Sequence, residues 1–149
     1  MRLLLDTHIF LWWVSDWGRI AERTRDAIAD PGNEVFVSAV TGWEIGVKKA
    51  KGHLVAPDNL AAVVGEKDLA HLPLTFDHAE RAANLPLRHR DPFDRMLIAQ
   101  AQAEGLTLVT RDSRIPLYDV STMPACGTSS ANRKARAAAK RGSPRSSSQ

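Results

Sequence analysis

The amino-acid sequence predicts an α/β fold with a central, mostly parallel β-sheet, and three observations support this. Short apolar runs of strand length alternate with longer segments whose apolar residues recur at helical spacing. Strands that alternate with helices need crossover connections, which favour parallel pairing. The 149 residues are 44% hydrophobic and 25% charged, so the chain is long enough for one domain with a sizeable core.

The first strand is expected at residues 2–6, where three leucines precede Asp6. Residues 7–14 carry six successive apolar side chains from position 9 onward, which predicts a helix packed on two sides that ends before Gly18. Residues 20–30 predict a second helix, because their small and apolar residues recur at helical spacing. The turn-forming sequence Pro-Gly-Asn then separates this helix from the next element.

The second strand is expected at residues 34–37, another short apolar run. Ser38 can cap a helix at 39–51, and Gly52 can end it. A further helix is expected at 57–67, with a proline near its first turn.

The remaining part of the body holds two more helices and the last strands. Thr75 can cap the first of these helices, while Asp91 followed by Pro92 is typical of the start of the second, which Gly105 can end. The limits are expected at 69–74 (strand), 75–84 (helix), 92–104 (helix), 106–110 (strand), 111–116 (turn) and 117–121 (strand).

Charge is unevenly distributed along the chain, whose formal net charge is +3 and whose pI is near 9.4. Residues 1–119 hold 14 Lys and Arg against all 17 Asp and Glu, a net charge of −3, whereas residues 120–149 carry +6. Residues 125–149 contain no large apolar side chain, so we expect a folded domain at 1–124 and a basic, disordered tail at 125–149. Both a solvated tail without a specific role and an arm that contacts RNA fit this composition.

Several classes of protein are excluded by the sequence. No apolar run approaches the ~20 residues needed to span a bilayer, and the N-terminal run is too short for a signal peptide. A single cysteine, Cys126, makes neither an internal disulfide nor a zinc cluster. The five histidines lack metal-ligand spacing such as HExxH, and neither a P-loop nor a G-x-S-x-G motif occurs. We therefore expect a soluble cytoplasmic protein.

Four carboxylates lie where a parallel α/β sheet binds its ligands. Asp6 ends the first strand, and Asp112 follows the strand at 106–110. Asp94 lies in the first turn of the helix before that strand, and Glu44 lies in the helix after the second strand. Because binding crevices form outside the carboxyl ends of such strands, these acids can meet at one rim of the sheet.

Each acid also has a structural explanation. Asp6 can cap the first helix, and Asp112 can start a turn. Asp91 and Asp94 both fit a capped helix start, although this explains Asp91 better than Asp94.

Glu44 is the most informative of the acids, because it is expected on the apolar stripe formed by Val40, Trp43 and Val47. A carboxylate on an inward face needs a partner, since burying it alone is costly. Lys48, four residues on, offers an ion pair worth about 0.2–0.5 kcal/mol. A metal ion or a basic group of a substrate is the functional alternative.

Gathered carboxylates repel one another and stay partly protonated at neutral pH unless cations offset their charge. Oxygen ligands suit Mg²⁺ or Mn²⁺. Such ions lower the pKa of bound water and stabilise the attacking and leaving oxygens at a phosphorus centre. A cation held by these acids could therefore support a reaction at a phosphate ester, while the structural explanations of the single acids stay open.

A resemblance to a known family is carried by the segments LLLDTHIFLWW, VSAVTGWEI, LPLRHRDPFDRMLIAQAQAEGLTLVTRD and IPLYDVS. These resemble PIN-domain proteins, and most closely the VapC-type ribonuclease toxins of type II toxin–antitoxin systems. The resemblance covers roughly residues 1–122 and implies a three-layer α/β/α fold. The long basic tail is a departure, because those compact toxins usually lack it.

The resemblance also implies a site and an activity. Asp6, Glu44 and Asp94 match the core acids of a Mg²⁺ or Mn²⁺ site, Asp112 matches the usual fourth acid, and Thr110 matches a hydroxyl that helps to hold the site. Family members cut RNA endonucleolytically by metal-activated water. They are typically dimers, and a cognate antitoxin silences them by placing its C-terminal segment in the active-site groove.

Two other functions remain as alternatives. An aspartyl-phosphate phosphatase would use Asp6 as its nucleophile, but such enzymes need a second acid two residues on, where this chain has His8. A non-catalytic RNA-binding module would gain little from four acids facing an anionic backbone.

The roles of several large side chains near the acids stay open. Arg95 or Arg111 could meet phosphates, and each could equally form an outward salt bridge. Trp12, Trp13 and Trp17 could pack in the core or form an interface with a partner.

Overall fold

The structure, a computed structural model, describes residues 1–126 and contains a five-stranded sheet in the order β3-β2-β1-β4-β5. All neighbouring strands pair in parallel, which confirms the predicted α/β class. The strands are β1 (Arg2–Leu5), β2 (Glu34–Ser38), β3 (Ala70–Leu72), β4 (Thr107–Thr110) and β5 (Thr122–Pro124).

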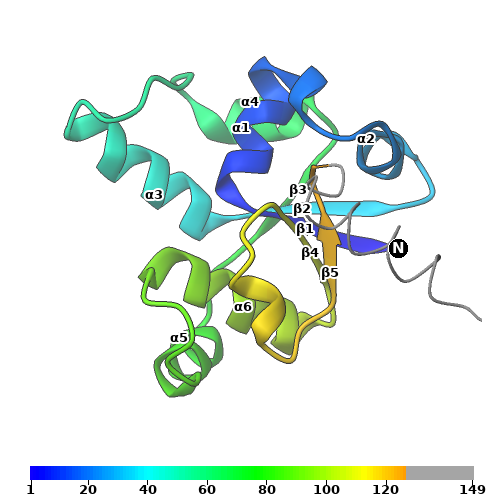
Figure 1. Ribbon diagram of the computed structural model, residues 1–149. Helices are drawn as coiled ribbons and strands as arrows, with labels where there is room; N and C mark the ends of the chain where they lie inside the picture. The colour runs from blue at the N-terminus through cyan, green and yellow to red at the C-terminus, as the bar shows by residue number, and fades with distance from the viewer. Residues whose placement is uncertain (127–149) are drawn as a thin grey trace, which may run out of the picture.

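Helices cover both faces of this sheet and complete the expected three layers. Figure 1 shows α1, α2 and α4 on one side of the strands and α5 and α6 on the other. The helices are α1 (Thr7–Ser15), α2 (Glu22–Ala29), α3 (Ala39–Ala50), α4 (Leu60–Glu66), α5 (Phe76–Asn84) and α6 (Pro92–Glu104), with short 3₁₀ turns η1 (Trp17–Arg19) and η2 (Ile115–Leu117).

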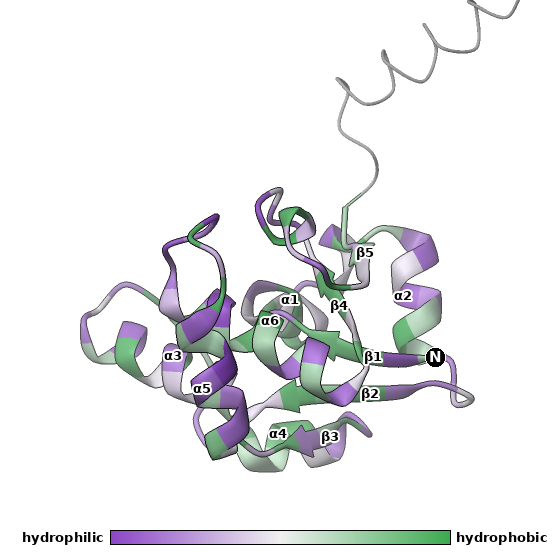
Figure 2. Ribbon diagram, turned by 90° about the horizontal axis from the view of Figure 1, so that it is seen from below, coloured by the Kyte–Doolittle hydropathy of each residue, from purple (hydrophilic) through white to green (hydrophobic). Residues whose placement is uncertain are grey.

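The leucines of β1 explain why the sheet needs two helical layers. Leu3 and Leu5 point into the core with α1 and α2, whereas Leu4 points into the core with α6. All three are fully buried, because successive side chains of a strand face opposite sides. Each such leucine contributes roughly 1.5–3 kcal/mol of burial free energy. Coloured by hydropathy, the central strands are largely hydrophobic, while α5 is markedly hydrophilic (Figure 2).

Strand β1 lies at the centre of the sheet and determines where a ligand can bind. The chain first moves from β1 through β2 to β3, and then returns to the opposite side of β1 for β4 and β5. This reversal leaves a crevice at the carboxyl ends of β1 and β4, where crossover helices diverge to opposite faces.

The predicted helix caps are present. The Ser38 hydroxyl accepts the backbone N–H of Val40 at the start of α3. The Asp91 carboxylate caps α6, which ends at Gly105 with a left-handed φ of 65°. Thr75 caps α5 in a reciprocal arrangement with His78. These local signals explain why the limits of α6 coincide with the predicted 92–104.

The last strand was predicted at 117–121, and this is wrong: β5 is at Thr122–Pro124. Residues 115–117 form a 3₁₀ turn that contains Pro116, and the following Tyr118 is buried. Strand pairing begins only where Leu108 meets Thr122. The helix predicted from 57 also begins later, at Leu60, because Asn59 has a left-handed φ of 54°.

Ala125, which was expected to begin the tail, is fully buried against the folded body. Its N–H donates to the carbonyl of Thr110, and its carbonyl accepts from Ala21. The rest of the tail predicted at 125–149, residues 127–149, lies outside the described residues. Within residues 1–126, no helix has the length and apolar character needed to cross a membrane.

Candidate functional site

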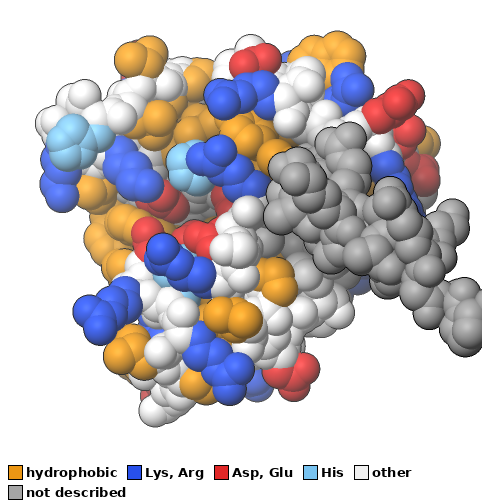
Figure 3. Space-filling model, viewed as in Figure 1, with side chains coloured by type: hydrophobic (Ala, Val, Ile, Leu, Met, Phe, Trp, Pro, Cys, Tyr) orange, Lys and Arg blue, Asp and Glu red, His pale blue; other side chains and the backbone are white. Residues whose placement is uncertain are grey.

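A polar pocket of about 570 Å³ opens at the carboxyl ends of β1 and β4. Figure 3 shows acidic side chains in a hollow near the centre of this face, with Lys, Arg and His side chains around it. The pocket is lined by the four predicted acids together with Thr7, His8, Lys48, His89, Asp91, Arg111, Ser113 and Arg114. The fold therefore brings the four acids to one rim, as their positions in the sequence predicted.

Asp6 both caps α1 and faces the pocket. One carboxylate oxygen accepts the N–H of His8 at 2.8 Å, and the other accepts the hydroxyl of Thr110 at 2.6 Å. Burial raises the pKa of Asp6 above its ordinary value, although these two hydrogen bonds act in the opposite direction. The capping role and the pocket position are therefore compatible.

Thr110 connects two of the acids. Its hydroxyl donates to Asp6 and accepts the N–H of Asp112 at 3.0 Å. The Asp112 carboxylate also accepts the N–H of Arg114 at 2.8 Å, which is the turn geometry that the sequence allowed. Since Thr110 ends β4, the strand itself determines the spacing between Asp6 and Asp112.

Glu44 is buried on the inner face of α3, as expected, and has two partners. The Thr7 hydroxyl donates to Oε1 at 2.7 Å, and Lys48 forms an ion pair with Oε2. Burial lowers the pKa of Lys48, but the hydrogen bond to Glu44 and the nearby acidic charges outweigh it and raise this pKa. The predicted ion pair with Lys48 is therefore present, and Glu44 also lines the pocket.

The stripe assigned to α3 is wrong in one member. Trp43 is 66% exposed and packs edge-on against Phe93 at a centroid distance of 5.3 Å. The buried residues of α3 are Val40, Thr41, Glu44 and Ile45. The helix is rotated toward the pocket, so its inward face is partly polar.

Asp91 and Asp94 have different roles at the start of α6. One oxygen of Asp91 accepts the N–H groups of Phe93 and Asp94, as a helix cap does. The Asp94 carboxylate forms no cap and instead points into the pocket toward His89. Burial, followed by the charges of Asp91 and Asp6, raises the pKa of Asp94 to about 7.

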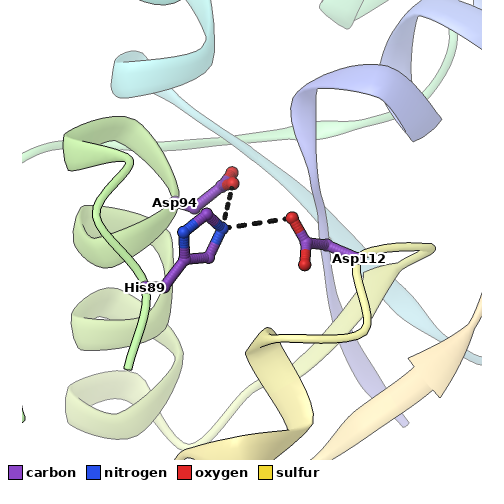
Figure 4. Close-up of side chains that lie close together, drawn as sticks. All are labelled: His89, Asp94 and Asp112. Carbon is purple, nitrogen blue, oxygen red and sulfur yellow. Dashed lines mark hydrogen bonds and ion pairs between the residues drawn. The ribbon is translucent and has the colours of Figure 1, made fainter. Parts of the chain in front are cut away.

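His89 is a site residue that the sequence analysis missed, since the histidines were judged only by their lack of metal-ligand spacing. Its side chain is almost fully buried, and Nε2 lies 2.8 Å from Asp94 and 3.1 Å from Asp112. Figure 4 shows the imidazole between these carboxylates, which come from α6 and from the loop after β4. The sequence feature that could have identified His89 is its position five residues before Asp94, in the segment HRDPFDR.

Arg95 was considered as a phosphate ligand, but the structure gives it another role. Its guanidinium donates to the carbonyls of Ala82, Leu85, Pro86 and His89, at distances from 2.9 to 3.3 Å. It therefore holds the loop before α6, and it forms no salt bridge with any acid of residues 1–126. Arg111 remains exposed at the pocket rim, with its guanidinium 4.8 Å from the centre of the Trp12 ring.

The three tryptophans divide between core and surface. Trp12 is 9% exposed and packs in the core, whereas Trp17 is 58% exposed. Trp13 is partly buried against the same core. Arg25 lies over the Trp17 ring at 4.8 Å, so a cation covers this exposed aromatic surface.

The chemistry of the pocket fits a hard divalent cation. Asp6, Glu44, Asp94 and Asp112 offer carboxylate oxygens, the donors that Mg²⁺ and Mn²⁺ prefer. The raised pKa values of Asp6 and Asp94 show that the fold holds these acids where their charges are unfavourable without a cation. His89, Asp94 and Asp112 also place one donor atom each within 4.8 Å of the others.

Comparisons with known proteins agree on one family. The family model described as PIN domain matches residues 3–121. Ribonuclease VapC22 of Mycobacterium tuberculosis is 28% identical over 116 residues, which are 76% of this chain and 88% of that protein.

Solved structures of low sequence identity share the fold. VapBC2 from Rickettsia felis, bound to a promoter DNA fragment, matches with a TM-score of 0.63 at 17% identity, over 83% of this chain and 98% of that chain. DNA-bound VapBC from Salmonella typhimurium matches with a TM-score of 0.63 at 22% identity, over 85% and 99%.

Proposed function

The chain belongs to the PIN-domain family, and from this premise we propose that it is a metal-dependent endoribonuclease, the toxin of a type II toxin–antitoxin system. The observation that carries the proposal is the meeting of four carboxylates from four separate elements in one pocket. The similarity to a protein named as a ribonuclease supports RNA as the substrate.

Asp6, Glu44, Asp94 and Asp112 would hold Mg²⁺ or Mn²⁺ in this proposal. When bound, such an ion activates water and stabilises negative charge on the oxygens of a phosphodiester undergoing hydrolysis. The donor set does not distinguish between the two ions, since carboxylate oxygens suit both.

Residues in and beside the pocket hold these acids and bind the substrate in this proposal. Thr110 orients Asp6, while Thr7 and Lys48 orient Glu44, so each buried carboxylate is kept in one position. Arg111 and Arg114 lie at the rim, where a guanidinium can donate to the phosphates on either side of the cleaved bond. The four acids would thus hold the cation that offsets the charge of the cleaved phosphate, and Arg111 and Arg114 would offset the charge of the neighbouring phosphates.

We propose RNA, a cognate antitoxin of the VapB type and a second copy of this chain as partners. The toxin–antitoxin complexes among the structural neighbours support the antitoxin. Because the substrate is cellular RNA, we propose that the protein acts in the cytoplasm.

RNA cleavage by the purified full-length chain tests the function. We expect endonucleolytic products that require Mg²⁺ or Mn²⁺, that EDTA abolishes, and that Asp6→Asn and Asp94→Asn both lack. Asp26→Asn is the matched control, because Asp26 is an exposed acid of α2 outside the pocket. Full cleavage by both pocket variants would contradict the site, and RNA binding without any cleavage would favour a non-catalytic module.

A further inference from the structure

Among residues 1–126, the imidazole of His89 is the only non-carboxylate side chain that contacts the carboxylate groups of two of the four acids. Its Nε2 lies 2.8 Å from Oδ2 of Asp94 and 3.1 Å from Oδ2 of Asp112. This position has two chemical interpretations. The nitrogen can be a metal ligand, or it can be a hydrogen-bond donor that holds the two carboxylates.

The other ring nitrogen distinguishes these interpretations. Nδ1 of His89 accepts the backbone N–H of Asp91 at 3.3 Å, so its lone pair is occupied. In the neutral imidazole the proton is then on Nε2, which donates to the two acids. A histidine that binds a metal has the opposite arrangement, because it donates its second N–H to an acceptor and offers a lone pair to the ion.

Hydrogen bonds fix the loop that carries His89, so that its imidazole stays between the two carboxylates. The N–H of His89 donates to the Tyr118 hydroxyl at 2.7 Å, and its carbonyl accepts from Arg95. The Tyr118 hydroxyl also donates to the carbonyl of Pro86 at 2.8 Å. Two residues outside the pocket therefore fix the backbone on either side of the ring, and the cap residue Asp91 fixes its tautomer.

We propose that His89 is a positioning residue, which holds Asp94 and Asp112 for the cation through its Nε2–H and is not itself a metal ligand. The inference rests on the proposed function, since it assumes that these acids bind the ion. Each carboxylate has roughly four lone-pair sites, so one hydrogen bond to His89 leaves the others available for a metal. The donor also reduces the repulsion between two acids that come from separate elements.

Metal binding by matched variants of the full chain tests the positioning role. The amide nitrogen of glutamine can replace the Nε2–H donor, whereas leucine cannot donate. We expect His89→Gln to bind Mn²⁺ within about threefold of the wild type and His89→Leu to bind about 10–100-fold more weakly in calorimetry, the usual cost of losing a residue that orients a ligand. His53→Leu, at an exposed position away from the pocket, is the control for loss of a histidine.

Two outcomes of this titration would overturn the inference. If His89→Leu binds Mn²⁺ as tightly as the wild type, the histidine does not position the acids. If His89→Gln is as weak as His89→Leu, the donor is not the reason for the effect. Circular dichroism of each variant establishes that it is folded.

Spectroscopy distinguishes a hydrogen-bond donor at His89 from a metal ligand. In ¹⁵N-imidazole NMR of the metal-free protein above pH 8, we expect His89 to carry its proton on Nε2. Pulsed EPR of bound Mn²⁺ compares the wild type with His89→Gln. If His89 were a ligand, the wild type would show a ¹⁴N coupling that the variant lacks, and we expect no such coupling. Such a coupling would overturn the inference and leave the proposed function intact, whereas failure of the wild type to bind Mn²⁺ would count against the proposed function itself.

Discussion

The two halves of the acidic pocket are built differently. On one side Asp6 and Glu44 are each only 3% exposed, and threonine hydroxyls hold them. On the other side the side chains of Asp94 and Asp112 are 18% and 29% exposed, and a single imidazole joins them. The first half is part of the core around β1, whereas the second half joins a helix to a loop.

Because of this difference, we expect substitutions in one half to change mainly the folding stability and substitutions in the other half to change mainly metal binding. A buried carboxylate that loses its hydroxyl donor is left unsatisfied, which lowers the free energy of unfolding. A partly exposed carboxylate can be solvated when its partner is lost, so the main consequence is a misplaced ligand. We expect the Asp6–Glu44 half to be sensitive in folding and the Asp94–Asp112 half to be sensitive in metal binding.

The largest expected effect is on cleavage, where both halves are needed. Asp6→Ala and Asp94→Ala should each lower kcat/KM for RNA on the order of 100-fold or more, comparable to the loss of one preorganised electrostatic group. Initial rates with a labelled RNA measure this. A variant of one half that retains near wild-type cleavage would show that the metal is held by the other half alone.

The next largest effect is on stability and belongs to the Asp6–Glu44 half. Thr110→Val removes the hydroxyl that bridges Asp6 and the N–H of Asp112, and should lower the free energy of unfolding by about 1–3 kcal/mol. Urea denaturation of the metal-free protein measures it. Thr122→Val is the control, because Thr122 lies in β5 and its hydroxyl takes part in none of the side-chain hydrogen bonds found within residues 1–126. Equal stability of the two variants would contradict the proposed difference between the halves.

A smaller, graded effect is expected from pH and belongs to the Asp94–Asp112 half. The pKa of Asp94 is raised from 3.8 to about 7, so the folded metal-free protein binds this proton more tightly than the unfolded chain does. The contribution of Asp94 to stability is therefore present below pH 4 and is lost as the pH rises toward 7. A cation needs the ionised carboxylate, so Mn²⁺ affinity should rise by at most about tenfold per pH unit up to pH 7.

Calorimetry at pH 6 and pH 8 in buffers of different ionisation enthalpy measures the protons released on Mn²⁺ binding. We expect release at pH 6 and little at pH 8. The Asp94→Asn variant should lose the difference between the two pH values. Proton release that persists in this variant would place the titration on another group.

The smallest effect is expected from removing residues 127–149, which contain none of the four acids. The kcat for RNA should stay within about twofold, because the acids are untouched. The KM should rise at low salt, since six positive charges that attract the phosphate backbone are lost. Steady-state kinetics at two salt concentrations measure both, and a large fall in kcat would give the basic segment a part in the site.

Local signals in the sequence were sufficient for most of the fold. The Asp91-Pro92 start and the Gly105 end define α6 because capping depends on residues only a few positions apart. Asp6 and Asp112 could be placed at one rim because each follows a strand of a parallel sheet. The basic net charge, by contrast, belongs to residues 120–149 and says little about the pocket.

Errors arose where contacts between distant segments decide the outcome. Arg95 binds carbonyls of the preceding loop, and Trp43 faces outward because α3 turns Glu44 toward Thr7 at the start of α1. The position of β5 depends on its register with β4, which the composition of residues 117–121 does not reveal.

By itself the sequence determined the alternation of strands and helices, the caps and the four acids, because these depend on local periodicity and on neighbouring residues. Only the tertiary structure decided that His89 lies between Asp94 and Asp112, and that hydroxyls hold Asp6 and Glu44. The physical reason is that such contacts join elements far apart in the chain. Their distances depend on strand order and helix rotation, which the packing of both cores determines together.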